Sequence, residues 1–237
     1  MVKICTVASR KGGVGKSTIA YELAYLLDAV LLDLDWDAGA ASVTWGYRAE
    51  DRAIDPLMRA IETGRAPRVL HGHNKPKLVP HSPQMVDVAL GVEEWRKLIR
   101  EWSQEWGSEW VVIDTHPGAS MAAHAAMSLS HIVLSPFGLR TKDLEAVRQI
   151  VREMADYPLI LVPNFVPRVP PATELNELKS IISGTPVRVA PIVPNASQIA
   201  TRRRRMAITA QQPVPKALRA AEQSYRMIAD YVEEYVK

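Results

Sequence analysis

Residues 11–18 have the sequence Lys-Gly-Gly-Val-Gly-Lys-Ser-Thr, and they lie between a short apolar run at residues 3–8 and a helical pattern at residues 16–27. Glycines let the backbone curl so that several N–H groups point at one anion, and the first turn of a helix adds the positive end of its dipole. A strand, a glycine-rich loop and a helix in this order are the context that a phosphate-binding loop requires. The stretch therefore predicts a nucleotide site in which Lys16 contacts the β- and γ-phosphates and Ser17 ligates Mg²⁺. The alternative is a glycine-rich turn that carries an exposed pair of lysines.

Outside this loop, short apolar runs rich in β-branched residues alternate with longer helical patterns. Strands are predicted near residues 3–8, 29–34, 85–90, 110–114, 131–135, 159–162 and 187–192. Helices are predicted near residues 16–27, 51–63, 92–106, 120–128, 141–157, 173–183 and 216–236. Continuous apolar strands separated by helices favour a parallel sheet that is covered on both faces. We therefore expect one α/β domain over residues 1–237, with a doubly wound, mostly parallel sheet of about seven or eight strands and the P-loop NTPase fold.

The composition excludes several classes of protein. The 237 residues are 47% apolar and 23% charged, which is typical of a soluble globular protein. The longest apolar runs are far shorter than the roughly 20 residues that a membrane span needs. The single cysteine, Cys5, excludes a disulfide framework, a cysteine-based zinc site and a cysteine-ligated iron–sulfur cluster within one chain. Its isolation also fits a reducing cytoplasm.

The charges are distributed unevenly along the chain. Residues 178–221 hold eight of the 29 Lys and Arg residues and none of the 26 Asp and Glu residues. Four of these basic residues are consecutive, at Arg202–Arg205. A second segment without acidic residues, 63–86, carries four basic residues and three histidines: Arg65, Arg68, Lys75, Lys77, His71, His73 and His81. An acidic body with a basic segment attracts polyanions.

The phosphate-binding loop departs from the standard G-x-x-x-x-G-K-[ST] pattern, because Arg10 replaces its first glycine and Lys11 follows. This deviant form, K-G-G-x-x-[GAV]-K-[ST], resembles the loop of the ParA/MinD group of P-loop ATPases. The resemblance implies that Lys11 crosses a dimer interface to the partner's nucleotide, so that two subunits enclose two ATP molecules. A cation fixed there stabilises charge on the transferring phosphoryl group.

Acidic residues stand at the ends of two predicted strands. The run Trp110-Val-Val-Ile-Asp114 is an apolar strand that ends in aspartate, a pattern in which the acid holds Mg²⁺ directly or through water. Partition ATPases carry a D-x-D-P-Q-like motif where this chain has Asp33-Leu34-Asp35-Trp36-Asp37. By that resemblance Asp35 orients the attacking water and Asp33 faces the magnesium shell. The alternative is that these two carboxylates only cap the following segment.

The same motifs differ from the family pattern at two places. Trp36-Asp37 replaces Pro-Gln, and His116 stands where relatives often carry proline. The catalytic residues that the resemblance implies are Lys11, Lys16 and Asp35. The implied metal ligands are Ser17, Asp33 and Asp114.

Asn164 follows the predicted strand at residues 159–162, and in the resembling family an Asn at this point contacts adenine. An Asn in a turn is the alternative. Phe165, Val166 and Pro167 follow Asn164, so the N-K-x-D motif of GTPases is missing and ATP is favoured over GTP. The ATP-binding residues implied by the resemblance are Lys11, Gly12, Gly13, Val14, Gly15, Lys16, Ser17, Thr18, Asn164 and Pro194.

The segment from Ile192-Val193-Pro194-Asn195 to Gln212-Pro213-Val214 resembles a stretch of partition ATPases in which basic residues bind nonspecific double-stranded DNA. We therefore predict DNA binding by Arg202, Arg203, Arg204 and Arg205. Four consecutive arginines cannot share one helix face, so they should form a broad patch. A solvated helix or a network of salt bridges is the alternative.

Together these resemblances imply a cytoplasmic, nucleoid-associated ATPase that requires Mg²⁺, forms a homodimer on ATP and segregates a plasmid or chromosome. A centromere-binding, ParB-like protein would stimulate its hydrolysis. The first strand is predicted from residue 3, which matches the short form without an N-terminal helix-turn-helix domain.

Two alternatives remain at this point. One is a MinD-like membrane-positioning ATPase, although the last predicted helix carries acids that an anionic membrane repels: Glu222, Asp230, Glu233 and Glu234. The other is a metabolic ATP-dependent synthetase on the same fold, which the presence of Lys11 disfavours.

Overall fold

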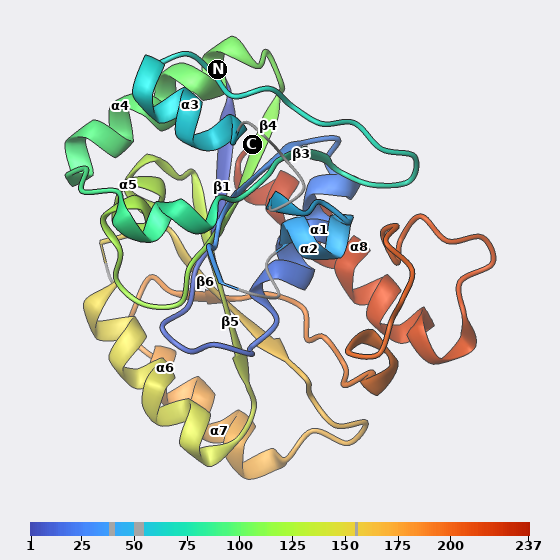
Figure 1. The fold of residues 1–237 in the computed structure, drawn as a ribbon. Coiled ribbons are helices and arrows are strands. Elements are labelled where there is room, and N and C mark those ends of the chain that lie inside the picture. The colour runs from blue at the N-terminus through green and yellow to red at the C-terminus, as the bar shows by residue number, and fades with distance from the viewer. Residues whose placement is uncertain (38–40, 50–54, 155) are drawn as a thin grey trace.

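Seven strands of the described chain form one parallel sheet, in the order β3-β2-β4-β1-β5-β6-β7 (Figure 1). The computed structural model describes residues 1–37, 41–49, 55–154 and 156–237. The strands are β1 (Lys3–Val7), β2 (Val30–Leu34), β3 (Lys77–Val79), β4 (Trp110–Thr115), β5 (Ile132–Gly138), β6 (Leu159–Asn164) and β7 (Arg188–Val189). Every pair of neighbouring strands runs parallel. The predicted doubly wound α/β architecture is therefore confirmed.

Helices cover both faces of this sheet. Successive residues of a strand point to opposite sides, and here the side chains on both sides are apolar and need to be covered. On one face, Cys5 and Val7 of β1 belong to a core that includes α1 (Lys16–Leu26) and α8 (Arg219–Tyr235). On the other face lie α3 (Pro56–Thr63), α4 (Val92–Glu105), α5 (Met121–Leu129), α6 (Thr141–Glu153) and α7 (Ala172–Ile182). The short helix α2 (Ala41–Trp45) follows β2, and 3₁₀ helices span Pro83–Asp87, Ser197–Ile199 and Lys216–Leu218.

The last helix packs on the body of the protein. Figure 1 shows α8 beside α1, and the two helices are in contact. Its buried residues include Ile228 and Val232, which lie four residues apart and so share one side of the helix.

The strand predicted at residues 85–90 is wrong. The first half of that run belongs to the 3₁₀ helix Pro83–Asp87, which begins after Ser82. Ser82 Oγ accepts a hydrogen bond from the Gln84 N–H at 3.1 Å. The edge of the sheet beside β2 is instead occupied by β3, with Val30 opposite Lys77. A three-residue edge strand is too short to show the apolar alternation by which strands are recognised in a sequence.

Other element boundaries also differ from the prediction. The helix predicted at residues 51–63 begins in the described chain at Pro56, where Asp55 Oδ1 accepts hydrogen bonds from the N–H groups of Leu57 and Met58. Residues 51–54 of that prediction lie outside the described residues. The strand predicted at residues 187–192 is limited to Arg188–Val189, and Pro191 two residues later has no N–H to continue a ladder.

Candidate functional site

The loop between β1 and α1 is curled by glycines in left-handed conformations. Gly13 has φ of 73° and Gly15 has φ of 91°, a region that other residues adopt only at a cost. A Cβ atom on Gly15 would lie 2.2 Å from Asn164 Nδ2, so a side chain could not be accommodated there without displacing Asn164. The sequence places glycine at the point where both the backbone and its neighbour require it.

This loop forms one wall of a pocket of about 480 Å³. Lys16 lines the pocket although only 4% of its surface is exposed, so its ammonium is held inside the protein rather than in solvent. The pocket is lined by Gly12, Gly13, Gly15, Lys16, Ser17, Thr18, Asp35, Asp37, Pro117, Phe165, Asn195, Ala196, Ser197, Ile199 and Ala200. Glycine N–H groups, a lysine and two hydroxyls on one wall suit a polyphosphate.

Asn164, at the end of β6, holds the phosphate-binding loop. Its Nδ2 donates a hydrogen bond to the Val14 carbonyl oxygen at 2.8 Å, and its Oδ1 accepts one from the Phe165 N–H. Phe165 and Asn195 line the pocket, whereas Pro194 pairs with Val166 in an isolated bridge. The adenine contact expected of Asn164 and the ATP contact expected of Pro194 stay predictions.

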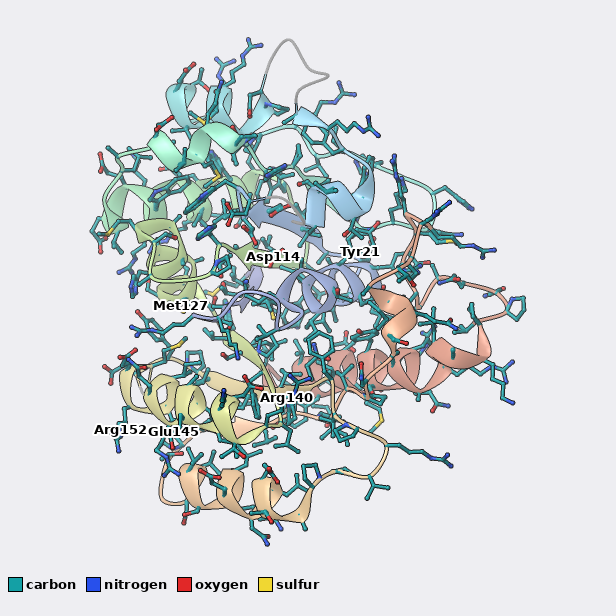
Figure 2. The ribbon with its side chains drawn as sticks, turned by 60° about the horizontal axis from the view of Figure 1, so that its bottom comes forward. Tyr21, Asp114, Met127, Arg140, Glu145 and Arg152 are labelled. Carbon is teal, nitrogen blue, oxygen red and sulfur yellow. The ribbon has the colours of Figure 1, made fainter. Side chains whose placement is uncertain are left out.

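Asp114 is a buried carboxylate whose two oxygens have no hydrogen-bond partner of normal geometry among the described residues. Figure 2 shows it deep within the molecule, close to α1. Burial raises the pKa of Asp114 well above its usual range, the charge of Asp33 raises it further, and nearby Ser17 and Lys16 oppose the shift. An unpaired buried carboxylate beside a hydroxyl and another carboxylate supplies the hard oxygen donors that Mg²⁺ prefers. The residues present therefore fit the predicted magnesium site.

Asp33 lies opposite Asp114 in the β2–β4 pair, but its oxygens already accept hydrogen bonds within the protein. Its Oδ2 accepts from the Ser42 N–H at 2.7 Å and from Ser42 Oγ at 2.6 Å, and its Oδ1 accepts from the Asp35 N–H at 3.1 Å. Burial nevertheless raises the pKa of Asp33 to about 6, and the bonds from Ser42 oppose that shift. In this state Asp33 anchors the start of α2, and its place in a magnesium shell stays a prediction.

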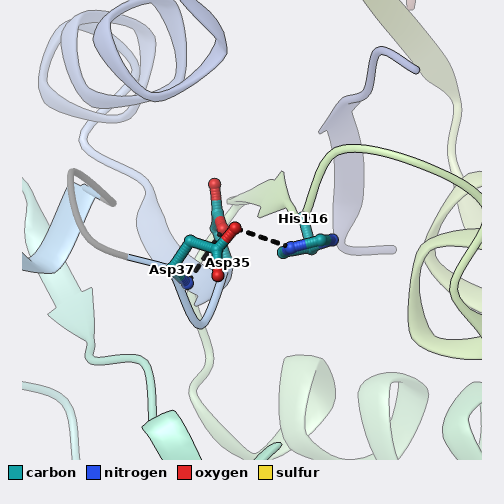
Figure 3. Close-up of side chains that lie close together, drawn as sticks. All are labelled: Asp35, Asp37 and His116. Atoms are coloured by element: carbon teal, nitrogen blue, oxygen red, sulfur yellow. Dashed lines mark hydrogen bonds and ion pairs between the residues drawn. The ribbon is translucent and has the colours of Figure 1, made fainter. Parts of the chain in front are cut away.

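The two positions that depart from the family pattern lie side by side (Figure 3). His116 Nε2 is 3.0 Å from Asp37 Oδ2, and the His116 ring stacks on Trp36 with centroids 3.8 Å apart and planes within 3°. The Asp37 N–H in turn donates to Asp35 Oδ1 at 3.2 Å. Burial raises the pKa of Asp35, while the charges of Lys16 and His116 oppose the shift. His116, whose role the sequence left open, thus steadies the loop that carries Asp35.

Lys11 is not among the residues that line the pocket with Lys16. Its side chain is more than half exposed, and its ammonium forms an ion pair with Asp143, whose own side chain is nearly buried at the start of α6. Gly138 makes room for this carboxylate, since a Cβ there would lie 2.5 Å from Asp143 Oδ2. In the single chain, the Lys11 ammonium is therefore paired with Asp143. The resemblance implies that the same ammonium contacts the nucleotide of a partner subunit.

The four consecutive arginines are not helical, which disagrees with the alternative of a solvated helix, and they are not equivalent. Arg203, Arg204 and Arg205 are exposed, but Arg202 is half-buried and its Nη2 donates to the Met206 carbonyl oxygen at 2.7 Å. Burial lowers the pKa of Arg202, and the charge of Glu22 opposes that shift. Three of the four predicted arginines therefore present their charge to solvent, and the fourth also stabilises the turn.

Helix α1 fixes this segment to the phosphate-binding loop. Glu22 is buried, and its carboxylate accepts hydrogen bonds from Ile208 N–H, Thr209 N–H and Thr209 Oγ1 at 2.7–3.0 Å. One residue earlier, Tyr21 Oη donates to the Arg205 carbonyl oxygen at 2.8 Å. No sequence pattern indicated Glu22, Ser42 or Asp143: Glu22 and Asp143 act through partners more than a hundred residues away, and Ser42 belongs to no recognised motif.

No helix in the described part of the chain combines the length and the apolarity that crossing a membrane requires.

Comparison with known proteins agrees with this geometry. The profile of the CobQ/CobB/MinD/ParA nucleotide binding domain matches residues 5–208. The chromosome-partitioning ATPase Soj of Thermus thermophilus is 27% identical over 160 residues, which are 65% of this chain and 62% of that protein. The match thus spans less than two thirds of the length of Soj.

Solved structures share the fold over almost the whole chain. A MinD cell division protein of Aquifex aeolicus superposes with a TM-score of 0.74 and 16% identity, covering 98% of this chain and 97% of that one. A plasmid partition protein of Borrelia burgdorferi bound to AMPPNP gives 0.69 and 19%, covering 99% and 100%. The McdA(D38A)–ATP complex of Cyanothece gives 0.73 and 14%, covering 99% and 96%.

Proposed function

Since this chain belongs to the CobQ/CobB/MinD/ParA nucleotide-binding domain family, we propose that it is a partition ATPase that forms a dimer on ATP, binds nonspecific duplex DNA and hydrolyses ATP to ADP and phosphate. The observation that carries the proposal is the pocket in which Lys16, Ser17 and the acidic side chain of Asp35 meet. We take residues 1–237 as a single ATPase domain that acts on the nucleoid in the cytoplasm.

ATP with Mg²⁺ is the ligand that the pocket fits best. The curled loop and Lys16 would bind the phosphates, and Ser17, Asp114 and Asp33 would hold Mg²⁺, which would neutralise phosphate charge. Asp35 would orient the attacking water; a loose phosphoryl-transfer transition state needs positioning more than a strong base. The contacts from Asp37 and, through it, His116 limit the positions that Asp35 can take.

Dimerisation would require Lys11 to leave Asp143. In the family resemblance this lysine reaches the nucleotide of the partner subunit, whereas in the single chain it is paired in cis. Lys11 is the more exposed member of this pair, and a triphosphate carries more negative charge than the single carboxylate of Asp143, so a partner's nucleotide would compete for the lysine. Hydrolysis would then depend on the dimer.

DNA and a centromere-binding, ParB-like protein are the partners that this proposal names. Arg203, Arg204 and Arg205 offer exposed cations, Arg202 adds charge at their base, and the surrounding segment 178–221 has no acidic residue. Soj is described as a chromosome-partitioning ATPase, and the Borrelia protein as a plasmid partition protein. Both descriptions support a role in DNA segregation.

A MinD-like membrane-positioning ATPase is the second candidate, favoured by the similarity to MinD structures. In this chain α8 packs on α1 and carries Glu222, Asp230, Glu233 and Glu234. Sedimentation with anionic vesicles in the presence of ATP separates the two candidates, since the partition proposal expects the protein to stay in the supernatant.

The central experiment is a gel shift on nonspecific duplex DNA with ATP, with ADP and without nucleotide. We expect the affinity for DNA to be at least about tenfold higher with ATP than with ADP. We also expect this affinity to fall steeply as the salt concentration rises. Lys11→Ala should reduce the ATP-dependent shift if dimerisation needs this lysine. Equal binding in all three nucleotide states would contradict an ATP-controlled DNA switch.

A further inference from the structure

The two acid-free segments of the sequence meet in space. The Ala207 N–H, two residues after the arginines, donates a hydrogen bond to the Asn74 carbonyl oxygen at 2.8 Å. Asn74 lies in the loop before β3, at φ of 56°, between His73 and Lys75. Residues more than a hundred positions apart in the chain are thus joined by a backbone hydrogen bond.

The end of α2 lies between these two segments and supports both. Lys75 Nζ donates to the Trp45 carbonyl oxygen at 2.8 Å and lies 4.3 Å from the centroid of the Trp45 ring. On the next residue, Gly46 (φ 94°) lies against Arg205: a Cβ there would be 2.6 Å from Arg205 Cδ. The loop therefore contacts the last residue of α2, and the arginine segment contacts the residue that follows it.

The charges of the two segments act together. His71, His73, Arg203, Arg204 and Arg205 are exposed, and Lys75 is half-buried. The positive charge of Arg205 adds to burial in lowering the pKa of Lys75, so the two cations feel each other's field. Cations placed this close, with no acid in either segment, create a local potential that favours a polyanion.

We propose that His71, His73 and Lys75, together with Arg203–Arg205, form one basic surface that binds the phosphates of duplex DNA. The inference rests on the proposed function and extends its DNA contacts to a loop that the sequence did not connect with them. Duplex DNA fits better than an acidic protein, because the exposed side chains of this surface, His71, His73 and Arg203–Arg205, are polar or charged, whereas protein interfaces rely on apolar and aromatic anchors. A line of phosphates needs only such a spread of positive side chains.

The test compares two charge-matched variants in binding to a short labelled duplex with ATP, read by fluorescence anisotropy over a range of salt. His71→Glu/His73→Glu changes the basic surface, and Lys97→Glu changes an exposed residue of α4, which covers the other face of the sheet. Both lower the formal net charge by two, with histidine counted as neutral. We expect the two added carboxylates to repel the DNA phosphates, so that the double variant binds DNA about tenfold more weakly, and Lys97→Glu to bind like the unchanged protein.

A second variant, Lys75→Gln, removes a charge without adding one and should weaken binding by about threefold. The ATP affinity and the melting temperature of every variant are measured as controls. Values equal to those of the unchanged protein would show that the pocket and the fold are intact. If the double variant binds DNA as well as Lys97→Glu does, while Arg203–Arg205→Gln does not bind, the loop is not part of the surface and the inference is wrong. If the unchanged protein binds no DNA in any nucleotide state, the proposed function itself fails.

Discussion

The two sides of the nucleotide pocket are built by different means. On one side, the loop from Gly12 to Ser17 takes its shape from main-chain geometry, with glycines at positive φ and Asn164 bonded to the loop carbonyl of Val14. On the other side, Asp35 depends on the loop that follows it: the Asp37 N–H donates to Asp35 Oδ1, and contacts among the side chains of Asp37, His116 and Trp36 hold that loop in place. A main-chain site depends on residue types at fixed spacing, whereas a side-chain site depends on which partners the fold brings together.

The largest effect should come from the main-chain side, through Lys16→Ala. Lys16 is the buried cation of the pocket, so its loss removes charge-assisted bonds to the phosphates. We expect ATP affinity to fall at least about 100-fold, or about 2.8 kcal/mol, measured by isothermal titration calorimetry. Lys11→Ala is the control, and its monomer should keep ATP affinity within about threefold. Unchanged ATP binding by Lys16→Ala would refute the phosphate-binding loop.

A smaller effect should come from the side-chain side, through His116→Ala. The change removes the partner of Asp37 and the ring stacked on Trp36, so Asp35 is positioned less well. We expect hydrolysis to slow about tenfold while ATP affinity stays within about threefold, because misplacement affects the chemical step more than binding. Phosphate release and calorimetry measure the two quantities separately.

His124→Ala on α5 serves as the histidine control and should leave both quantities unchanged. A His116→Ala protein that loses ATP affinity but not turnover would show that the contact supports binding instead of positioning.

The smallest effect concerns the pH dependence of stability in the protein without nucleotide or metal. Burial raises the pKa of Asp33 to about 6 from an ordinary value of 3.8. A carboxyl group with a raised pKa binds its proton more tightly in the folded state, so its stabilising contribution is complete below about pH 4 and is lost as the pH rises through 6. From pH 7 to pH 5, this group should therefore increase the free energy of unfolding by about 1 kcal/mol.

Urea unfolding of the unchanged protein and of Asp33→Asn at both pH values measures this contribution. The asparagine variant should lack that part of the increase, since its side chain does not titrate. Identical pH dependence in the two proteins would show that Asp33 does not carry the raised pKa.

Much of the fold could be predicted from the sequence, because β1, β2, β4, β5 and β6 are continuous apolar runs buried on both faces. The short edge strand β3 could not, because three residues give no periodic signal and the nearby run at residues 85–90 gives a misleading one.

The candidate site, like the fold, has parts that the sequence predicts and parts that it does not. Glycine and lysine at fixed spacing predicted the loop, and strand-end acids predicted Asp114 and Asp35. The bond from Ser42 to Asp33, the pairing of Lys11 with Asp143 and the stacking of Trp36 on His116 join residues that only the folded chain brings together. No pattern of residue types in the sequence predicts these contacts.

Helix α2 touches two functional regions within five residues. At its start Ser42 is bonded to Asp33, which lies opposite Asp114, and at its end Trp45 and the following Gly46 contact Lys75 and Arg205. We therefore expect a ligand that displaces Ser42 from Asp33 to shift the contacts of Lys75 and Arg205 as well. Energetic coupling of this kind is reciprocal: whatever free energy bound nucleotide adds to the affinity for nucleic acid, nucleic acid must add equally to the affinity for nucleotide.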